Sequence, residues 1–241
     1  MKLQAAFVAA MGLLCLQSAH AGPADYVYTP TVEEGEKEID FKFGTRDSSP
    51  RKSVSSIGFG YGVNDWWFTE AYVKYAKEGG GTKYDAFELE NKFQLTETGK
   101  YPVDVGLITE IEIARDRSDG IELKFGPLFQ TEIGKWQLNG NILFEKVVDA
   151  ATSSPTVMLY QWQAKYRWQS TLEFGLQGFG EMGKWNDWDS HDQQFHNIGP
   201  AVFSKIPLDA HKAIKYNAAW LFGLTNGTPD NTFRMQVELE F

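Results

Sequence analysis

From Glu38 to the end of the chain, apolar and polar residues alternate with a period of two, and turn residues separate the alternating segments. Between Met158 and Trp168, for example, every second residue is apolar or aromatic, and Gln161, Gln163, Lys165 and Arg167 lie between them. Successive side chains of a strand point to opposite faces, so the pattern predicts strands with one apolar and one polar face. We count about twelve such segments.

The predicted apolar face is aromatic, and no segment is predicted to form a helix that could cover it. A sheet of this kind fits contact with lipid, where every backbone N–H and C=O must find a partner inside the protein. The sequence therefore predicts an all-β fold: a closed antiparallel transmembrane β-barrel of about 12 strands in an up-and-down meander over residues 36–241. The weakest of the predicted strands is Phe195–Ser204, because Pro200 interrupts it.

The connections between these segments differ in length and predict how the barrel is threaded. With the N-terminus in the periplasm, the long polar connections Val147–Thr156 and Lys184–Gln194 would lie outside the cell. The short connections Asn64-Asp65 and Gln169-Ser170 would be periplasmic turns, whereas Lys205–Lys212 is longer than this rule expects.

The first residues have the pattern of an export signal. Lys2 is followed by an apolar run and by Ala19-His20-Ala21, so we expect residues 1–21 to be a cleaved signal peptide. Residues 22–35, which we call the leader, are expected to be a periplasmic extension or a tail that enters the lumen.

The amino-acid composition narrows the class of protein further. The 241 residues contain 17 Phe, 10 Tyr and 8 Trp, and the single cysteine, Cys15, lies in the expected signal peptide. The net charge of −9 argues against nucleic acid as a partner, and no cofactor is expected. Most tryptophans of the apolar face should anchor strands at the two lipid interfaces.

The last segment, Phe233–Phe241, alternates and ends in phenylalanine. It resembles the C-terminal signature that Gram-negative outer-membrane barrels present to the assembly machinery. The resemblance implies that Phe241 is an assembly signal, that the protein resides in the outer membrane of a Gram-negative bacterium, and that its partners are outer-membrane lipid and the barrel-assembly machinery. Two further stretches, Tyr61–Trp67 and Phe222–Thr225, resemble small proteobacterial outer-membrane transporters, including those linked to phenol-degradation pathways.

The polar face of the predicted strands is the candidate functional surface. Acidic residues outnumber basic ones there, which favours a narrow channel or porin for small polar or cationic solutes rather than an enzyme. Opposed Glu and Lys side chains could instead pair and close the interior, which would make the protein a structural barrel. The candidates that would line the lumen and set its selectivity are Glu70, Lys74, Glu88, Glu90, Lys92, Glu110, Glu112, Glu122, Lys124, Lys165, Arg167, Arg234 and Glu238.

The predicted outer loop 184–194 carries two weaker possibilities. Ser190, His191 and Asp192 are adjacent, as in a hydrolase acting on lipid at the rim, but neighbours on an extended chain point apart. Asp187, Asp189 and His191 could bind a divalent cation, although their spacing matches no defined metal loop. We therefore expect no catalytic residues and no resident metal.

Overall fold

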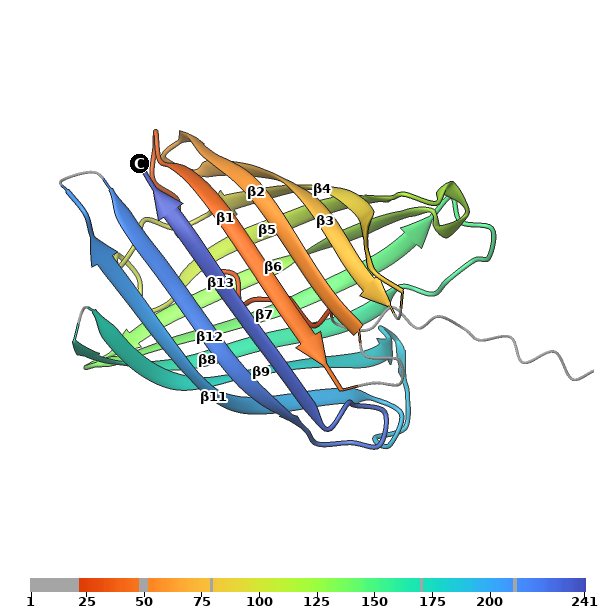
Figure 1. Cartoon of the computed structure of the whole chain (residues 1–241). Helices are drawn as coiled ribbons and strands as arrows, with labels where there is room; N and C mark the ends of the chain where they lie inside the picture. The colour runs from red at the N-terminus through yellow and green to blue at the C-terminus, as the bar shows by residue number, and fades with distance from the viewer. Residues whose placement is uncertain (1–21, 48–51, 79, 170, 210–211) are drawn as a thin grey trace, which may run out of the picture.

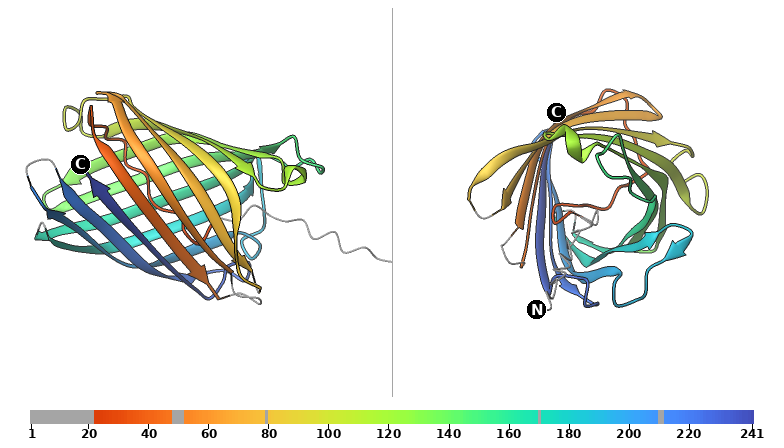
Figure 2. Two further views of the ribbon diagram at one scale, coloured as in Figure 1. Left: turned by 45° about the horizontal axis from the view of Figure 1, so that its top comes forward. Right: turned by 90° about the vertical axis from the view of Figure 1, so that its right-hand side faces the viewer.

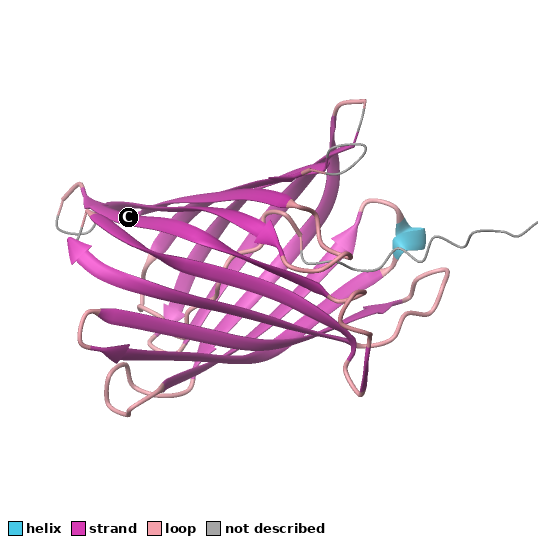
Figure 3. Ribbon diagram, turned by 90° about the horizontal axis from the view of Figure 1, so that it is seen from below, coloured by secondary structure: helices cyan, strands magenta, loops and turns pink. Residues whose placement is uncertain are grey.

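The computed structural model describes residues 22–47, 52–78, 80–169, 171–209 and 212–241, and these form a closed barrel of β-strands (Figure 1). Strands and loops make up almost the whole described chain, with one short 3₁₀ turn, η1 (Arg117–Asp119) (Figure 3). None of its helices is long and apolar enough to cross a membrane. The wall strands are β1 (Lys37–Arg46), β2 (Lys52–Asn64), β3 (Trp67–Glu78), β4 (Thr82–Gln94), β5 (Asp104–Ala114), β6 (Ile121–Ile133), β7 (Trp136–Val148), β8 (Val157–Gln169), β9 (Leu172–Lys184), β11 (Phe195–Pro207), β12 (Ala213–Gly223) and β13 (Asn231–Glu240).

These strands form an antiparallel meander that closes on itself. Each strand pairs with its neighbours along the chain, and β13 pairs with β1 to complete the circle. A two-residue strand, β10 (Asp187–Trp188), pairs with Gly183 and Lys184 at the end of β9 and forms a small hairpin beyond the wall. The predicted fold, a closed antiparallel barrel of twelve strands, is therefore confirmed.

The two faces of the wall differ as the alternation predicts. On β2, Ile57 and Phe59 are each 51% exposed on the outside, whereas Ser56 is buried on the inside. We call the end of the barrel where the Phe241 N–H donates to the Lys37 carbonyl the C-terminal rim, and the other end the loop rim. Outer aromatic rings lie in contact at both rims, as at a membrane interface, in the pairs Trp66/Phe93, Trp136/Tyr166 and Trp168/Phe174 at the C-terminal rim and Tyr75/Tyr84 and Trp220/Phe233 at the loop rim.

Pro200 lies inside β11, the strand predicted with least certainty. Its neighbour β12 is paired on either side of Gly199 and Pro200 but not at these two residues, because proline has no N–H to donate. The same interruption occurs between β6 and β7 at Gly126 and Pro127. Each glycine lets a carbonyl of the neighbouring strand come close, so the register is kept through both interruptions.

The leader lies inside the barrel. It leaves the wall at the C-terminal rim and crosses the lumen, as the view along the axis shows in red (Figure 2). Its far end, Gly22 and Pro23, lies near Arg46 and Thr232 at the loop rim. Of the two interpretations of residues 22–35, the structure agrees with the second, a tail that enters the lumen.

Candidate functional site

The leader is held to the wall by hydrogen bonds at the C-terminal rim. Gly35 N–H donates to the Gly62 carbonyl, and Gly62 N–H donates to the Glu36 carbonyl, each at 2.8 Å. Further in, Val32 N–H donates to Gln94 Oε1 at 2.7 Å. These contacts fix the point at which the chain turns back from β1 into the lumen.

Glycines of the inner wall make room for the leader backbone. A Cβ on Gly44 would lie 1.9 Å from the carbonyl oxygen of Pro23, and a Cβ on Gly62 would lie 1.9 Å from that of Glu33. Both distances are far shorter than any van der Waals contact. The leader can therefore occupy this path only because the wall has no side chain at these two positions.

At mid-height, the inner wall carries an apolar belt that the leader completes. Tyr28 is buried against one cluster of the belt, and Val27 is buried against the other. In addition, Asn141 Nδ2 donates to the Tyr28 carbonyl at 3.1 Å. Burial of this apolar surface favours the docked leader. The wall residues of the two clusters are Ile108, Leu128, Leu143, Leu159 and Phe195 around Tyr28, and Phe179, Ala201, Phe203, Ala219 and Leu221 around Val27.

Next to the belt, three carboxylates stand in one row across neighbouring strands. Glu70 is directly opposite Glu90, and Glu90 is directly opposite Glu110. Like charges in directly opposed positions destabilise a sheet. The leader offsets part of this repulsion with two hydroxyl groups. The Tyr26 hydroxyl lies 2.9 and 2.7 Å from the two carboxylate oxygens of Glu90, and the Tyr28 hydroxyl donates to Glu110 Oε2 at 2.9 Å.

A lysine of the wall connects the same region to the leader. Lys42 Nζ lies 3.6 Å from the ring centroid of Tyr26 and 3.6 Å from that of Tyr72, so the cation sits against one ring of the leader and one of the wall. It also lies 3.6 Å from Asp40 Oδ2, which accepts a hydrogen bond from the Tyr72 hydroxyl. A cation against aromatic rings is stabilised by their quadrupoles, so Lys42 holds Tyr26 in place.

Two further lysines neutralise most of the remaining acidic side chains of β4–β7. Lys74 pairs with Glu88 and Glu112. Lys124 lies 3.0 Å from Glu110, 3.4 Å from Glu122 and 3.7 Å from Glu145. This part of the lumen is therefore a network of ion pairs and not an open acidic surface.

The wall of β6–β9 is built differently, from amide side chains that satisfy one another. Gln137 and Asn139 both donate to Gln130 Oε1, and Asn139 Oδ1 accepts in turn from Gln163 at 3.0 Å. Gln177 Nε2 donates to Gln163 Oε1 at 3.0 Å, and Gln177 Oε1 accepts from Arg234 at 2.6 Å. This amide network contains no leader residue.

The lumen has a cavity toward each rim, and a much smaller space lies beside the far end of the leader. The larger, about 470 Å³, opens toward the C-terminal rim, and the leader segment 26–31 forms one side of it. The smaller, about 240 Å³, lies toward the loop rim among Glu112, Arg115, Asp116 and Glu122. Hydrogen bonds from the backbone N–H and hydroxyl of Ser118 lower the pKa of Asp116. Leader residues 26–28 fill the lumen between the apolar clusters at mid-height.

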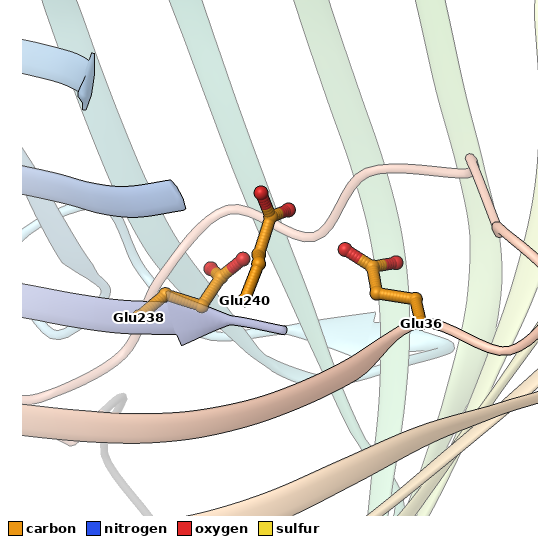
Figure 4. Close-up of side chains that lie close together, drawn as sticks. All are labelled: Glu36, Glu238 and Glu240. Carbon is orange, nitrogen blue, oxygen red and sulfur yellow. The ribbon is translucent and has the colours of Figure 1, made fainter. Parts of the chain in front are cut away.

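Among the residues that the structure describes, two groups of three carboxylates lie close enough to share a cation, but lysines already pair with both groups. Glu36, Glu238 and Glu240 converge at the C-terminal rim (Figure 4), and Lys215 Nζ pairs with all three. The second group, Glu88, Glu110 and Glu112, pairs with Lys74 and Lys124. Both arrangements are ion-pair clusters without need of a metal.

The structure places every predicted lumen residue on the inner face, while a role in selectivity stays a prediction. Glu70, Glu88, Glu90, Glu110 and Arg234 are buried; Lys92, Lys165, Arg167 and Glu238 line the larger cavity; Glu112 and Glu122 line the smaller one; and Lys74 and Lys124 lie in the ion pairs between them.

The outer loop does not gather its candidate residues into a site. Asp187, Asp189 and His191 are not among the groups that could share a metal, and the Ser190 hydroxyl donates to Gln193 instead of a histidine. His191 stacks on His196, whose ring nitrogens are hydrogen-bonded to Tyr160 and Gln194.

Sequence reasoning missed the apolar belt. Ile108, Leu128, Leu143 and Leu159 were not assigned to a face, yet each has the same parity as charged or amide residues on its own strand. Four apolar side chains on the polar face of consecutive strands were the available signal for a docked segment.

The closed twelve-stranded wall, its lipid-type outer face and its polar lumen define an outer-membrane β-barrel. No protein-family model matches the chain, and no curated protein sequence matches it. Among solved structures, the chain is similar to the NanC porin, with a TM-score of 0.57 and 11% identity over 84% of this chain and 98% of that chain. It is also similar to an outer membrane channel from Pseudomonas putida F1, with a TM-score of 0.60 and 12% identity over 91% of this chain and 98% of that chain. At such identities, the similarity shows the fold alone.

Proposed function

We propose that the protein is a channel in the outer membrane of a Gram-negative bacterium, and that it passes small polar or cationic solutes through a lumen narrowed by its own leader. The observation that carries the proposal is a polar inner wall with a cavity toward each rim and the leader between them. The printed names of the two similar structures, a porin and an outer membrane channel, support the same class of function.

The leader decides how much of the lumen can conduct. Its mid-section is buried in the apolar belt, which leaves no wide path between the cavities while it is docked. Passage then requires the leader to shift. A segment that interrupts no strand pairing can leave the wall without breaking the barrel, because the strands pair only with one another.

The carboxylate row gives the open lumen its preference for cations. When the leader withdraws, Glu90 and Glu110 lose the tyrosine hydroxyls that now donate to them. Glu110 keeps its ion pair with Lys124 at 3.0 Å, so the charge of Glu90 is the one that would attract cations and repel anions at close range.

The test is conductance in planar bilayers, with variants that displace the leader without altering any of its side chains. Gly44→Ala combined with Gly62→Ala introduces two methyl groups where the leader backbone now lies. We expect this variant to show larger or more frequent current steps than the wild type. Gly140→Ala is the matched control, since nothing lies within 4 Å of the added methyl group.

A second candidate function is that of a structural barrel without transport, which the internal ion pairs and the amide network favour. It predicts that the wild type and both glycine variants are electrically silent although they migrate as folded barrels on unheated gels. That result would contradict the channel.

A further inference from the structure

The larger cavity has the dimensions of a binding site. Its volume of about 470 Å³ lies within the range of pockets that hold small molecules, roughly 300 to 1,000 Å³. Leader residues form one side of it and the wall of the barrel forms the rest. A solute that enters from the C-terminal rim must occupy this cavity before it meets the leader.

The two sides of the cavity carry different charged groups. Glu38, Glu70 and Glu90 line it from β1, β3 and β4, with Lys92 beside them. Lys165 and Arg167 line it from β8, four to five strands away around the wall. Lys165 pairs with Glu173 at 3.2 Å, and Arg167 pairs with Glu132. Because lysine has three N–H donors and arginine five, this side can still receive a carboxylate, whereas the opposite side is rich in acceptors.

The acidic side contains a carboxylate oxygen that lacks a partner. Glu70 is only 4% exposed, and its Oε1 accepts no hydrogen bond within the described part of the chain. A buried carboxylate oxygen without a donor is costly, so this oxygen is where an incoming ammonium group would gain most. On β12, away from Glu70, the cavity oxygen Asn217 Oδ1 also lacks a donor among the described residues.

We propose that this cavity binds zwitterions whose charges are well separated, such as ω-amino acids, with the ammonium group toward Glu70 and the carboxylate toward Lys165 and Arg167. The proposal rests on the proposed function in that such solutes would be the ones the channel admits. A solute with a single charge is attracted by one side and repelled by the other. A zwitterion gains at both sides, and its gain grows with the distance between its charges.

Isothermal titration calorimetry on the detergent-solubilised full-length mature protein at pH 7.5 tests the proposal with a matched series of ligands. We expect 6-aminohexanoate to bind at least about fivefold more tightly than glycine, hexylamine or hexanoate. Equal binding of all four, or no binding of 6-aminohexanoate, would overturn the proposal.

Two variants identify the sides of the cavity. Glu70→Gln should weaken 6-aminohexanoate binding about fivefold and should not weaken hexanoate binding, because it removes a charge that repels the carboxylate. Lys165→Gln should weaken the binding of both ligands. Retained hexanoate binding shows that Glu70→Gln still folds. Asp119→Asn, in the smaller cavity, is the control and should bind like the wild type. If Glu70→Gln and Lys165→Gln bind 6-aminohexanoate like the control, the assignment of the cavity is wrong.

Measurements of ligand binding and of single-channel current distinguish this inference from the proposed function. Selective binding in the absence of any single-channel current would support the cavity as a zwitterion site and contradict the channel. Current that 6-aminohexanoate does not reduce, together with no calorimetric signal, would contradict the site and leave the channel standing.

Discussion

The two halves of the barrel wall solve the problem of buried polar groups in different ways. In the amide network of β6–β9, the side chains donate and accept among themselves. In the row of β3–β5, Glu70, Glu90 and Glu110 repel one another across the strands, and two of the three receive hydrogen bonds from the leader. The hydrogen bonds of the amide network are complete without the leader, whereas those of the carboxylate row are not.

This difference explains where the leader docks. A buried carboxylate without a donor costs free energy, and the hydroxyls of Tyr26 and Tyr28 remove part of that cost. The glycines that make room for the backbone, Gly44 and Gly62, lie on β1 and β2 beside the same half of the wall. The tyrosine hydroxyls thus hold the leader at the carboxylate row, while its apolar residues and the bond from Asn141 hold it against the belt on the other strands. It can leave without breaking a bond within the amide network.

The largest expected effect comes from removing the leader. Deletion of residues 22–34 leaves every strand intact and should raise single-channel conductance several-fold in planar bilayers. The reversal potential in a KCl gradient should also shift toward that of K⁺, because Glu90 then faces the open lumen. Unchanged conductance after the deletion would show that the leader does not limit the path.

A smaller effect should follow from removing only the two hydroxyls. Tyr26→Phe combined with Tyr28→Phe keeps the aromatic rings but loses hydrogen bonds to carboxylates worth about 2 kcal/mol each. We expect more frequent openings and a lower unfolding temperature of the barrel on gels, because two buried carboxylates lose hydrogen-bond donors. Tyr84→Phe on the outer face is the control, and identical opening frequency in both variants would contradict the role of the hydroxyls.

The smallest effect on conduction should come from the other half of the wall. Asn139→Leu breaks the amide network and should lower the free energy of unfolding by about 1 to 3 kcal/mol, since it leaves buried amide groups without partners. The unfolding temperature on gels should fall while conductance stays that of the wild type. A change in conductance of the size seen for the leader variants would mean that the two halves are not independent.

The fold could be predicted from the sequence because alternation is a local property. In each strand, the alternation of apolar and polar residues shows which side chains face lipid. Closure of the barrel follows because every backbone N–H and C=O must be paired in a bilayer. The inward position of residues such as Glu88 and Lys124 follows from the same parity.

The arrangement inside the lumen could not be predicted in this way. Whether Glu90 stands opposite a lysine or another glutamate depends on the register between strands, which alternation leaves open by steps of two residues. The leader has no alternation at all, so its path depends on the shape of the finished barrel. The parity of Ile108 and Leu143 places them on the polar face of their strands. Parity alone does not show that a segment such as the leader packs against them.

The central claim, that residues 22–35 dock inside the barrel, is tested most directly by cross-linking. Val27 and Ala219 belong to one apolar cluster, whereas Ala86 lies on the inner wall outside both clusters. Val27→Cys paired with Ala219→Cys should be joined by a short bismaleimide in the folded protein, and Val27→Cys paired with Ala86→Cys should not. Absence of the cross-link in the first pair, or equal yield in both, would contradict the docked leader.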